Sequence, residues 1–346
     1  MRRVDNPKNR FESAHLHFDE EGLQAPWAGL RVHEERCKEI VSENRSPDVP
    51  FRYSVNPYRG CQHACSYCYA RPSHQYWGYG AGSDFERELI VKVNAPERLR
   101  ARLERPGWKG ETLAFSGNTD CYQPLEGRFG LTRQLLAVCL DYRNPVAIIT
   151  KSPLITRDLE LLVELSRRAR LRVFISIAFA DDRLRAAIEP GAPSVERRFE
   201  ALSALSEAGI ETGVAVAPLI VGLGDDQAAA VLERAAAAGA RHCFRIALRL
   251  PAEVAEVFET RLREALPARA EAVLNAQREI RGGGLNQAGF GQRMQGSGPR
   301  WRAVEDLFDL SARRFGLRVS AMEGAEPEQT TSFRRPRGQL SLFDNG

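Results

Sequence analysis

The chain has 346 residues, of which 43% are apolar and 27% are charged, so it is long enough to bury a large core. It contains no apolar run of membrane-spanning length, and its first residues, MRRVDNPKNRFE, lack the apolar segment of a secretory signal. We therefore expect a cytoplasmic protein without a membrane partner. The seven cysteines, an odd number, favour reduced thiols or metal ligation over a framework of disulfides.

The formal net charge of +4 is compatible with a polyanionic partner but does not require one. Arginine supplies most of the positive charge, and its planar fork suits bidentate contacts to phosphate groups. The same richness in Ala and Arg can also reflect GC-rich coding. Both interpretations of the charge stay open.

The first 50 residues are polar and show no sustained period, which predicts an extended arm with one short helix over residues 31–42. Residues 51–56, FRYSVN, alternate between apolar and polar side chains as a strand does. This strand leads through Pro57 and Gly60 into a loop that reads GCQHACSYCYA.

That loop carries Cys61, Cys65 and Cys68, spaced three residues and then two apart. Three thiolates so close in sequence can converge on one metal centre. A four-iron cube needs a ligand on each iron, so three cysteines leave one iron open for an exogenous ligand. A structural zinc site needs a fourth ligand, for which His63 and His74 are the nearby candidates, and a disulfide is a further alternative.

The cysteine spacing, with aromatic Tyr67 before the last cysteine, closely resembles the radical S-adenosylmethionine (SAM) superfamily. The resemblance implies two cofactors, a [4Fe-4S] cluster held by the three cysteines and SAM bound to the open iron, with Tyr67 near the cofactor. It also implies reductive cleavage of SAM to methionine and a 5′-deoxyadenosyl radical. An electron donor such as flavodoxin or ferredoxin is then a necessary partner. The protein has to aim the radical that the cofactor supplies.

Beyond residue 70, strand-like runs alternate with helical stretches, which indicates a parallel sheet built from right-handed crossovers. With residues 51–56 the predicted strands are 112–116, 146–150, 172–178, 211–217 and 241–247; the predicted helices are 95–104, 131–142, 156–169, 194–208 and 226–238. Six such α/β units resemble the superfamily's partial (β/α)6 TIM-type barrel. Functional residues are therefore expected at the carboxyl ends of the strands.

Four further stretches resemble the spore photoproduct lyase branch of the superfamily, also described as DNA repair photolyase-like. They are FSGNTDCYQP, AIITKSP, FISIAF with IEPGAPSVERRFEAL, and GVAVAPLI. The resemblance implies SAM contacts for residues in each stretch: Ser116, Gly117, Asn118, Lys151, Ser176, Arg198 and Ala217. The acidic residue that many members carry after the second strand is absent, so backbone carbonyls or Asn118 would have to bind the methionine amino group. Pro218 cannot donate to a strand ladder and is expected to end the fifth strand.

The loop after the second strand also carries three candidate catalytic residues, Asp120, Cys121 and Tyr122. In the lyase a cysteine of this loop returns a hydrogen atom to the product radical, and Cys121 lies several residues from that position. Asp120 and Tyr122 are candidates for orienting the substrate. The alternatives are a plain loop thiol, a turn-stabilising aspartate and a packed aromatic ring.

Residues 282–298 are rich in Gly, Gln and Asn and predict a loop. It is either a flexible linker or, as we favour, a segment folded over the barrel mouth that buries Phe290 and Met294. Residues 300–315 have the apolar spacing of an amphipathic helix packed on the barrel, and the polar stretch from about residue 323 predicts disorder. The predicted organisation is an amino-terminal extension (1–50), the radical SAM partial barrel (51–285), a packed loop and helix (286–322) and a tail (323–346).

The tail ends with Gln339, Leu340, Ser341, Leu342 and Phe343, which resemble the short peptide that docks bacterial repair and replication proteins into the sliding clamp. Apolar anchors on a tether and a glutamine amide suit such docking. The alternative is an ordinary apolar terminus folded back on the barrel.

Together these features predict a radical SAM enzyme of lyase type that abstracts hydrogen from a nucleic-acid substrate, in the manner of DNA repair. Two alternatives remain: a radical SAM enzyme that modifies RNA or a protein side chain, and a non-catalytic iron–sulfur adaptor recruited to the clamp.

Overall fold

The computed structural model describes residues 23–24, 29–319 and 331–336, and its main feature is a large open sheet. This sheet has eight strands in the order β12-β11-β10-β9-β8-β7-β4-β3. All neighbours in it are parallel except the antiparallel pair β3 and β4. The strands are β3 (Val41–Glu43), β4 (Tyr53–Val55), β7 (Leu113–Phe115), β8 (Val146–Thr150), β9 (Leu171–Ser176), β10 (Glu211–Leu219), β11 (His242–Ala247) and β12 (Arg318–Val319). The sheet does not close, so the fold is an α/β partial barrel, as predicted.

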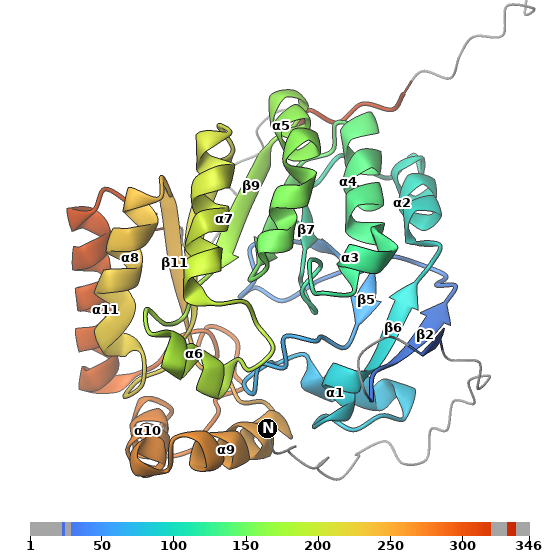
Figure 1. The fold of residues 1–346 in the computed structure, drawn as a ribbon. Helices are drawn as coiled ribbons and strands as arrows, with labels where there is room; N and C mark the ends of the chain where they lie inside the picture. Colours follow the sequence, from blue (N-terminus) through green and yellow to red (C-terminus); the bar gives the residue numbers. More distant parts are fainter. Residues whose placement is uncertain (1–22, 25–28, 320–330, 337–346) are drawn as a thin grey trace, which may run out of the picture.

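Helices cover the outer face of this sheet in a row (Figure 1). They are α2 (Ala95–Leu103), α4 (Leu131–Asp141), α5 (Leu159–Arg168), α7 (Val195–Glu207), α8 (Ala228–Ala237) and α11 (Gly298–Arg314); short 3-10 turns η2 (Pro153–Asp158) and η3 (Asp225–Gln227) precede α5 and α8. In β8, Ile148 is buried in the main core, while Ala147 and Ile149 on either side of it are partly exposed and line an inner cavity, which Val146 and Thr150 at the strand ends also reach. The alternation of side chains along a strand therefore gives one face to the helices and the other to a cavity.

The predicted helix over residues 31–42 is wrong. The structure instead has β2 (Arg31–Glu35) and β3, separated by a short extended stretch. The Asn94 side chain accepts a hydrogen bond from the Cys37 backbone N–H at 2.9 Å and donates one to its carbonyl at 3.1 Å. These backbone groups are thus paired outside a helix, and strand pairing of β2 with β6 (Glu88–Lys92) outweighs the weak local helical pattern.

A second sheet, which the sequence did not reveal, has the order β1-β2-β6-β5. Its remaining strands are β1 (Leu23–Gln24) and β5 (Tyr58–Arg59), and β5 runs directly into the cysteine loop. Next to it lie η1 (Arg71–Trp77) and α1 (Asp84–Arg87). The polar strand β2 and the two-residue strands β1 and β5 have no strong period, so tertiary pairing decides them.

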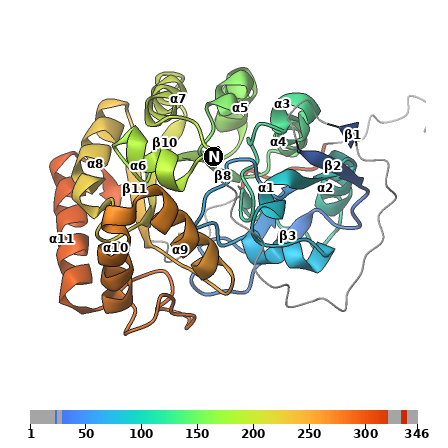
Figure 2. The ribbon, with the colours of Figure 1, turned by 60° about the horizontal axis from the view of Figure 1, so that its bottom comes forward.

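Helices α6 (Asp182–Ile188), α9 (Val254–Ala265) and α10 (Pro267–Ile280) gather at the carboxyl end of the large sheet, and α3 (Glu126–Phe129) follows β7. Figure 2 brings this end forward. Apolar side chains of α6, α9 and α10 share a buried cluster with Cys65 and Tyr67 of the cysteine loop. The cysteine loop is therefore packed into the protein on this side.

The segment 282–298 is a loop that folds back on the barrel, as favoured above, because the Ala247 N–H donates to the Met294 carbonyl at 3.0 Å. The predicted burial of Phe290 is wrong, since 64% of this residue is exposed, whereas Met294 is half-buried.

The prediction that the chain is disordered from about residue 323 is also wrong for residues 331–336. Phe333 stacks on Tyr142 with ring centroids 6.3 Å apart, and the Arg334 N–H donates to the Tyr142 carbonyl at 2.9 Å. The clamp-like residues 339–343 lie outside the described residues. Within the described ranges, no helix combines the length and apolar character needed to cross a membrane.

Candidate active site

The cysteine loop follows β5, where its first residue must be glycine. Gly60 has φ of +71°, and a Cβ there would lie 2.7 Å from both the Phe85 carbonyl oxygen and the Leu89 side chain. The Cys61 N–H donates to the same Phe85 carbonyl at 2.8 Å. Cys61 and Cys65 are buried, Cys68 is partly exposed, and all three are free thiols, so the disulfide alternative is wrong.

A second segment, Ile188 to Gly191 at the end of α6, is hydrogen-bonded to the cysteine loop. The Ser66 N–H and hydroxyl both donate to the Ile188 carbonyl, at 3.0 and 3.1 Å, and the Gly191 N–H donates to the His63 carbonyl at 3.0 Å. A Cβ on Gly191 would lie only 2.1 Å from the Gln62 carbonyl oxygen. The loop conformation therefore depends on a contact between residues far apart in the sequence.

The three cysteines open onto a cavity of about 720 Å³, a volume typical of small-molecule sites. The cavity lies against the inner face of the sheet and is walled by Phe174, Ala215 and Phe244 as well as by the loops after the strands. Polar groups line it at the carboxyl ends of β7, β8 and β9, and Thr112, Arg170 and Arg172 line it near the amino ends of β7 and β9.

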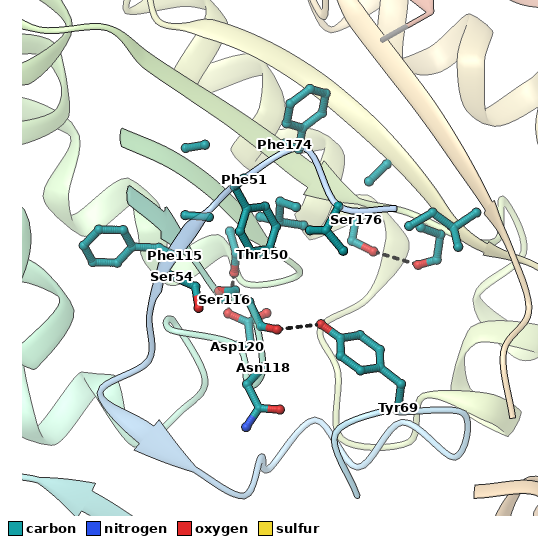
Figure 3. A pocket seen from close by; sticks show the side chains of 18 of the residues that line it. Phe51, Ser54, Tyr69, Phe115, Ser116, Asn118, Asp120, Thr150, Phe174 and Ser176 are labelled. Carbon is teal, nitrogen blue, oxygen red and sulfur yellow. Dashed lines mark hydrogen bonds between the residues drawn. The ribbon is translucent and has the colours of Figure 1, made fainter. Parts of the chain in front are cut away.

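The predicted SAM-binding residues except Arg198 all line this cavity: Tyr67, Ser116, Gly117, Asn118, Lys151, Ser176 and Ala217. Figure 3 shows Ser116 and Asn118 on the loop after β7, with the Tyr69 hydroxyl donating to the Gly117 carbonyl at 2.8 Å. The Ser176 hydroxyl donates to the Ala217 carbonyl at 3.2 Å. The prediction that Pro218 ends the fifth strand is wrong: β10 continues to Leu219, and the proline is accommodated at an irregularity in the pairing of β10 with β11.

Asp120 also lines the cavity, but its carboxylate is engaged within the protein. One oxygen accepts from the Thr150 hydroxyl at 2.7 Å, the other from the Lys151 N–H at 2.8 Å, and His63 Nδ1 lies 3.3 Å away. Burial by itself raises the pKa of Asp120, but the His63 ring and these hydrogen bonds outweigh it and hold the pKa well below its usual value. Asp120 thus ties the loop after β7 to β8 and to the cysteine loop.

The prediction that Cys121 and Tyr122 act on the substrate needs correction. Neither residue lines the cavity; Cys121 is 1% exposed and Tyr122 is 0% exposed, and both belong to the main core. The Tyr122 hydroxyl donates to Asp158 at 3.1 Å, behind the sheet. A thiol buried in the core cannot reach a substrate in the cavity, so the alternatives of a plain thiol and a packed aromatic ring hold.

Arg198 lies behind the cavity and contacts it only through other residues. Its guanidinium pairs with Glu189 at 2.5 Å and donates to the Ser176 carbonyl at 3.0 Å, while Glu189 also accepts from the Tyr67 hydroxyl. Burial by itself raises the pKa of Glu189, but Arg198 and Lys151 hold that pKa below its usual value. The network connects the aromatic ring of the cysteine loop to the end of β9.

Lys151 extends into the cavity from the end of β8, with its ammonium 5.7 Å from the centre of the Tyr67 ring. No acidic side chain among the described residues forms an ion pair with it. Burial lowers its pKa, but Cys65 and Glu189 outweigh this effect and raise the pKa above its usual value. Lys151 is therefore a cation that is available to an anionic ligand.

The donor set fits a cluster better than a zinc ion. Among the described residues, no three His, Cys, Asp or Glu side chains converge as ligands of a single ion. His63 faces Asp120, and His74 packs its ring against Phe85 at 5.5 Å. In a four-iron cube each cysteine binds a different iron. The three cysteine sulfurs therefore stand farther apart than the ligands of a single zinc ion do. Three thiols opening on a cavity, without a fourth protein ligand in the described part of the chain, fit a cube with one open iron.

Comparison with known proteins decides the family. A sequence model described as the Radical SAM superfamily matches residues 55–235. The chain belongs to the radical SAM superfamily. The cofactors of this family are a [4Fe-4S] cluster and SAM, which agrees with the prediction.

Sequence relatives extend across bacteria, archaea and viruses. An uncharacterized protein of Mycobacterium tuberculosis is 39% identical over 224 residues, which cover 63% of this chain and 65% of the relative, less than two thirds of its length. An uncharacterized protein of Methanocaldococcus jannaschii is 34% identical over a match that covers 55% of this chain and 68% of the length of that relative. A radical SAM Nα-GlyT isomerase of Pseudomonas phage M6 is 28% identical over 54% of this chain and 38% of its own.

Among solved structures, spore photoproduct lyase complexed with dinucleoside spore photoproduct has a TM-score of 0.62 at 16% identity, covering 85% of this chain and 82% of the lyase. At this identity the likeness concerns the fold. The radical SAM partial barrel and its resemblance to this branch are confirmed.

Sequence reasoning missed two parts of the site. The contact of Ile188–Gly191 with the cysteine loop was not predicted, because it joins segments more than 120 residues apart, although these residues begin the stretch IEPGAPSVERRFEAL noted above. Arg249, two residues after β11, and Met294 also line the cavity. The rule that functional residues follow barrel strands could have identified Arg249.

Proposed function

We propose that this radical SAM protein cleaves SAM reductively and uses the 5′-deoxyadenosyl radical to abstract hydrogen from a nucleic-acid substrate. The observation that carries the proposal is the cavity onto which Cys61, Cys65 and Cys68 open without a fourth ligand from the described chain. When bound there, the cluster supplies the electron that breaks the sulfonium bond. The protein's own residues have to hold SAM, exclude water and position the substrate.

Several cavity residues are suited to holding SAM. The Lys151 ammonium can bind the methionine carboxylate, since it has no acidic partner among the described residues. Carbonyl groups of residues 116–118 can accept from the methionine amino group, and the Ser176 hydroxyl, which donates to Ala217, can accept from a ribose hydroxyl. Tyr67 lies against Lys151, and Glu189 and Arg198 keep its ring in place. In this proposal Arg198 is a positioning residue.

A nucleic-acid substrate is supported by the charge at the cavity mouth. Arg249 lines the cavity and has no carboxylate partner among the described residues, so it can neutralise a phosphate. Fold likeness to a DNA-lesion lyase is consistent with this substrate class but does not determine it. Modification of RNA or of a protein side chain is the alternative that the experiment must separate.

The test is anaerobic reconstitution with iron and sulfide, followed by reduction in the presence of SAM. We expect 5′-deoxyadenosine from the wild type, none from Cys65→Ala, and wild-type amounts from Cys139→Ala, in which a buried thiol of the outer helix α4 is changed. Deuterated oligonucleotides should transfer deuterium into 5′-deoxyadenosine, whereas deuterated peptides should not. If no 5′-deoxyadenosine forms, the proposed enzymatic activity is contradicted and a non-catalytic iron–sulfur adaptor is favoured.

We also propose that residues 339–343, which lie outside the described residues, dock into a sliding clamp. Support comes from the preceding segment: the Thr331 hydroxyl donates to the Gly110 carbonyl at 2.9 Å, and Phe333 stacks on Tyr142. This segment, residues 331–336, lies on the side opposite α6, α9 and α10 (Figure 1), away from the side on which the cysteine loop is packed. Leu342→Ala with Phe343→Ala should abolish binding to purified clamp; unchanged affinity would contradict the proposal.

A further inference from the structure

Two exposed aromatic rings lie close to the cavity mouth. Phe290 is 64% exposed and Tyr69 is 48% exposed, although phenylalanine is among the residues most often buried. Each ring has a guanidinium over its face: Arg293 lies 4.8 Å from the centre of the Phe290 ring, and Arg249 lies 5.7 Å from that of Tyr69. Tyr69, Arg249 and Arg293 themselves line the cavity. We call these four residues the aromatic rim.

The exposure of Phe290 does not result from a loose loop. Asp48 accepts from the Gly291 N–H at 2.6 Å and pairs with Arg293 at 2.5 Å. Buried Arg281 donates to the Gln295 carbonyl at 2.5 Å, and the Met294 carbonyl accepts from Ala247. The turn that carries Phe290 is thus held by contacts on both sides, and the Phe290 ring is exposed on it.

Positive charge at this rim exceeds negative charge. Arg249, Arg281 and Arg293 lie together, and Asp48 is the carboxylate that pairs with one of them. Arg281 is occupied by backbone carbonyls, whereas Arg249 contacts the Met294 sulfur at 3.5 Å and keeps a buried Nε without a partner in the described chain. Aromatic faces combined with unneutralised arginines are typical of surfaces that stack bases and contact phosphates of single strands.

From these observations we infer that the aromatic rim is a docking surface for a single-stranded nucleic-acid segment, in which Phe290 and Tyr69 stack on bases and Arg249 contacts a phosphate. This inference rests on the proposed function, because it names how the substrate approaches the same cavity. The bases stacked on the rim flank the nucleotide that enters the cavity.

The test measures binding of a fluorescein-labelled 12-nucleotide DNA strand to the reconstituted protein by anisotropy, without SAM or reductant. Phe290→Ala should weaken binding about 5- to 100-fold, as expected for one stacked base, and Phe290→Tyr should retain it. Leu310→Ala, which changes an apolar residue of α11 that is 59% exposed, is the matched control. Equal affinities of Phe290→Ala and Leu310→Ala would overturn the inference.

A second measurement separates the phosphate contact from stacking. Arg249→Met should lower the slope of log affinity against log salt by about 0.7, whereas Arg314→Met, on the last turn of α11, should not. A strand with abasic sites should bind Phe290→Ala and wild type alike; a preserved difference would refute stacking. If no oligonucleotide binds at low salt while 5′-deoxyadenosine still forms, the docking inference fails and radical formation stands. If binding follows these expectations but no 5′-deoxyadenosine forms, the proposed enzymatic activity is refuted and the docking inference stands.

Discussion

Replacing Gly191 by alanine is expected to displace the cysteine loop without touching a cysteine. The added Cβ would lie 2.1 Å from the Gln62 carbonyl oxygen, whereas carbon–oxygen contacts are normally about 3.3 Å, so one backbone must move by about 1 Å. That movement stretches the hydrogen bond from the Gly191 N–H to the His63 carbonyl, now 3.0 Å. His63 stands between Cys61 and Cys65, and the displacement therefore reaches the cluster ligands.

The cost follows from three contributions. Overpacking costs about 1–3 kcal/mol, and loss of the hydrogen bond about 1 kcal/mol. Replacement of glycine restricts the unfolded chain and offsets about 0.4–1 kcal/mol of this. We expect a net decrease of about 2 kcal/mol in the free energy of unfolding and reduced cluster loading. Gly107→Ala is the matched control, because a Cβ at Gly107 meets nothing within 4 Å.

The assay compares bound iron and acid-labile sulfide per chain after anaerobic reconstitution, together with urea unfolding of the protein without metal. Gly191→Ala should bind less iron than Gly107→Ala and unfold at a lower urea concentration. If the two variants load equal iron and unfold alike, the contact between residues 188–191 and the cysteine loop does not position the cluster.

Three further predictions concern buried charges. Glu189→Gln leaves Arg198 buried without its counter-charge and should lower the free energy of urea unfolding by about 3–5 kcal/mol. The control is Glu196→Gln, which changes an exposed carboxylate and should have little effect; equal effects of the two substitutions would refute the buried ion pair. Lys151→Met removes an available cation and should weaken SAM binding about 10- to 100-fold in equilibrium dialysis of the reconstituted protein, with Lys151→Arg less affected. Burial lowers the pKa of His74 to about 4, so between about pH 6.5 and 4 the unfolded chain binds a proton that the folded chain does not. Stability should therefore fall with decreasing pH in this window, by up to about 3 kcal/mol from this residue, and His74→Phe should show a shallower fall; identical pH profiles would contradict the assignment.

The strands of the large sheet and the helices behind them were predictable because both have strong periods. Val146–Thr150 was predicted at its observed bounds, and α4 and α7 within one residue at each end. By contrast, β2 was predicted as a helix, because its polar residues have a weak local preference and are fixed by pairing with β6. The division into an extension, a barrel, a packed loop and helix, and a tail stays a prediction.

The sequence by itself determined the chemistry that is available: three cysteines spaced within one short loop, and polar residues at the ends of parallel strands. Local spacing is enough for this, since a loop of eight residues can present its own thiols to one centre. Only the tertiary structure decided which groups face the cavity. It buried Cys121 and Tyr122 in the core, placed Arg198 behind Glu189, and brought Gly191 against the cysteine loop. These outcomes depend on packing between segments that are distant in sequence, and no local pattern records them.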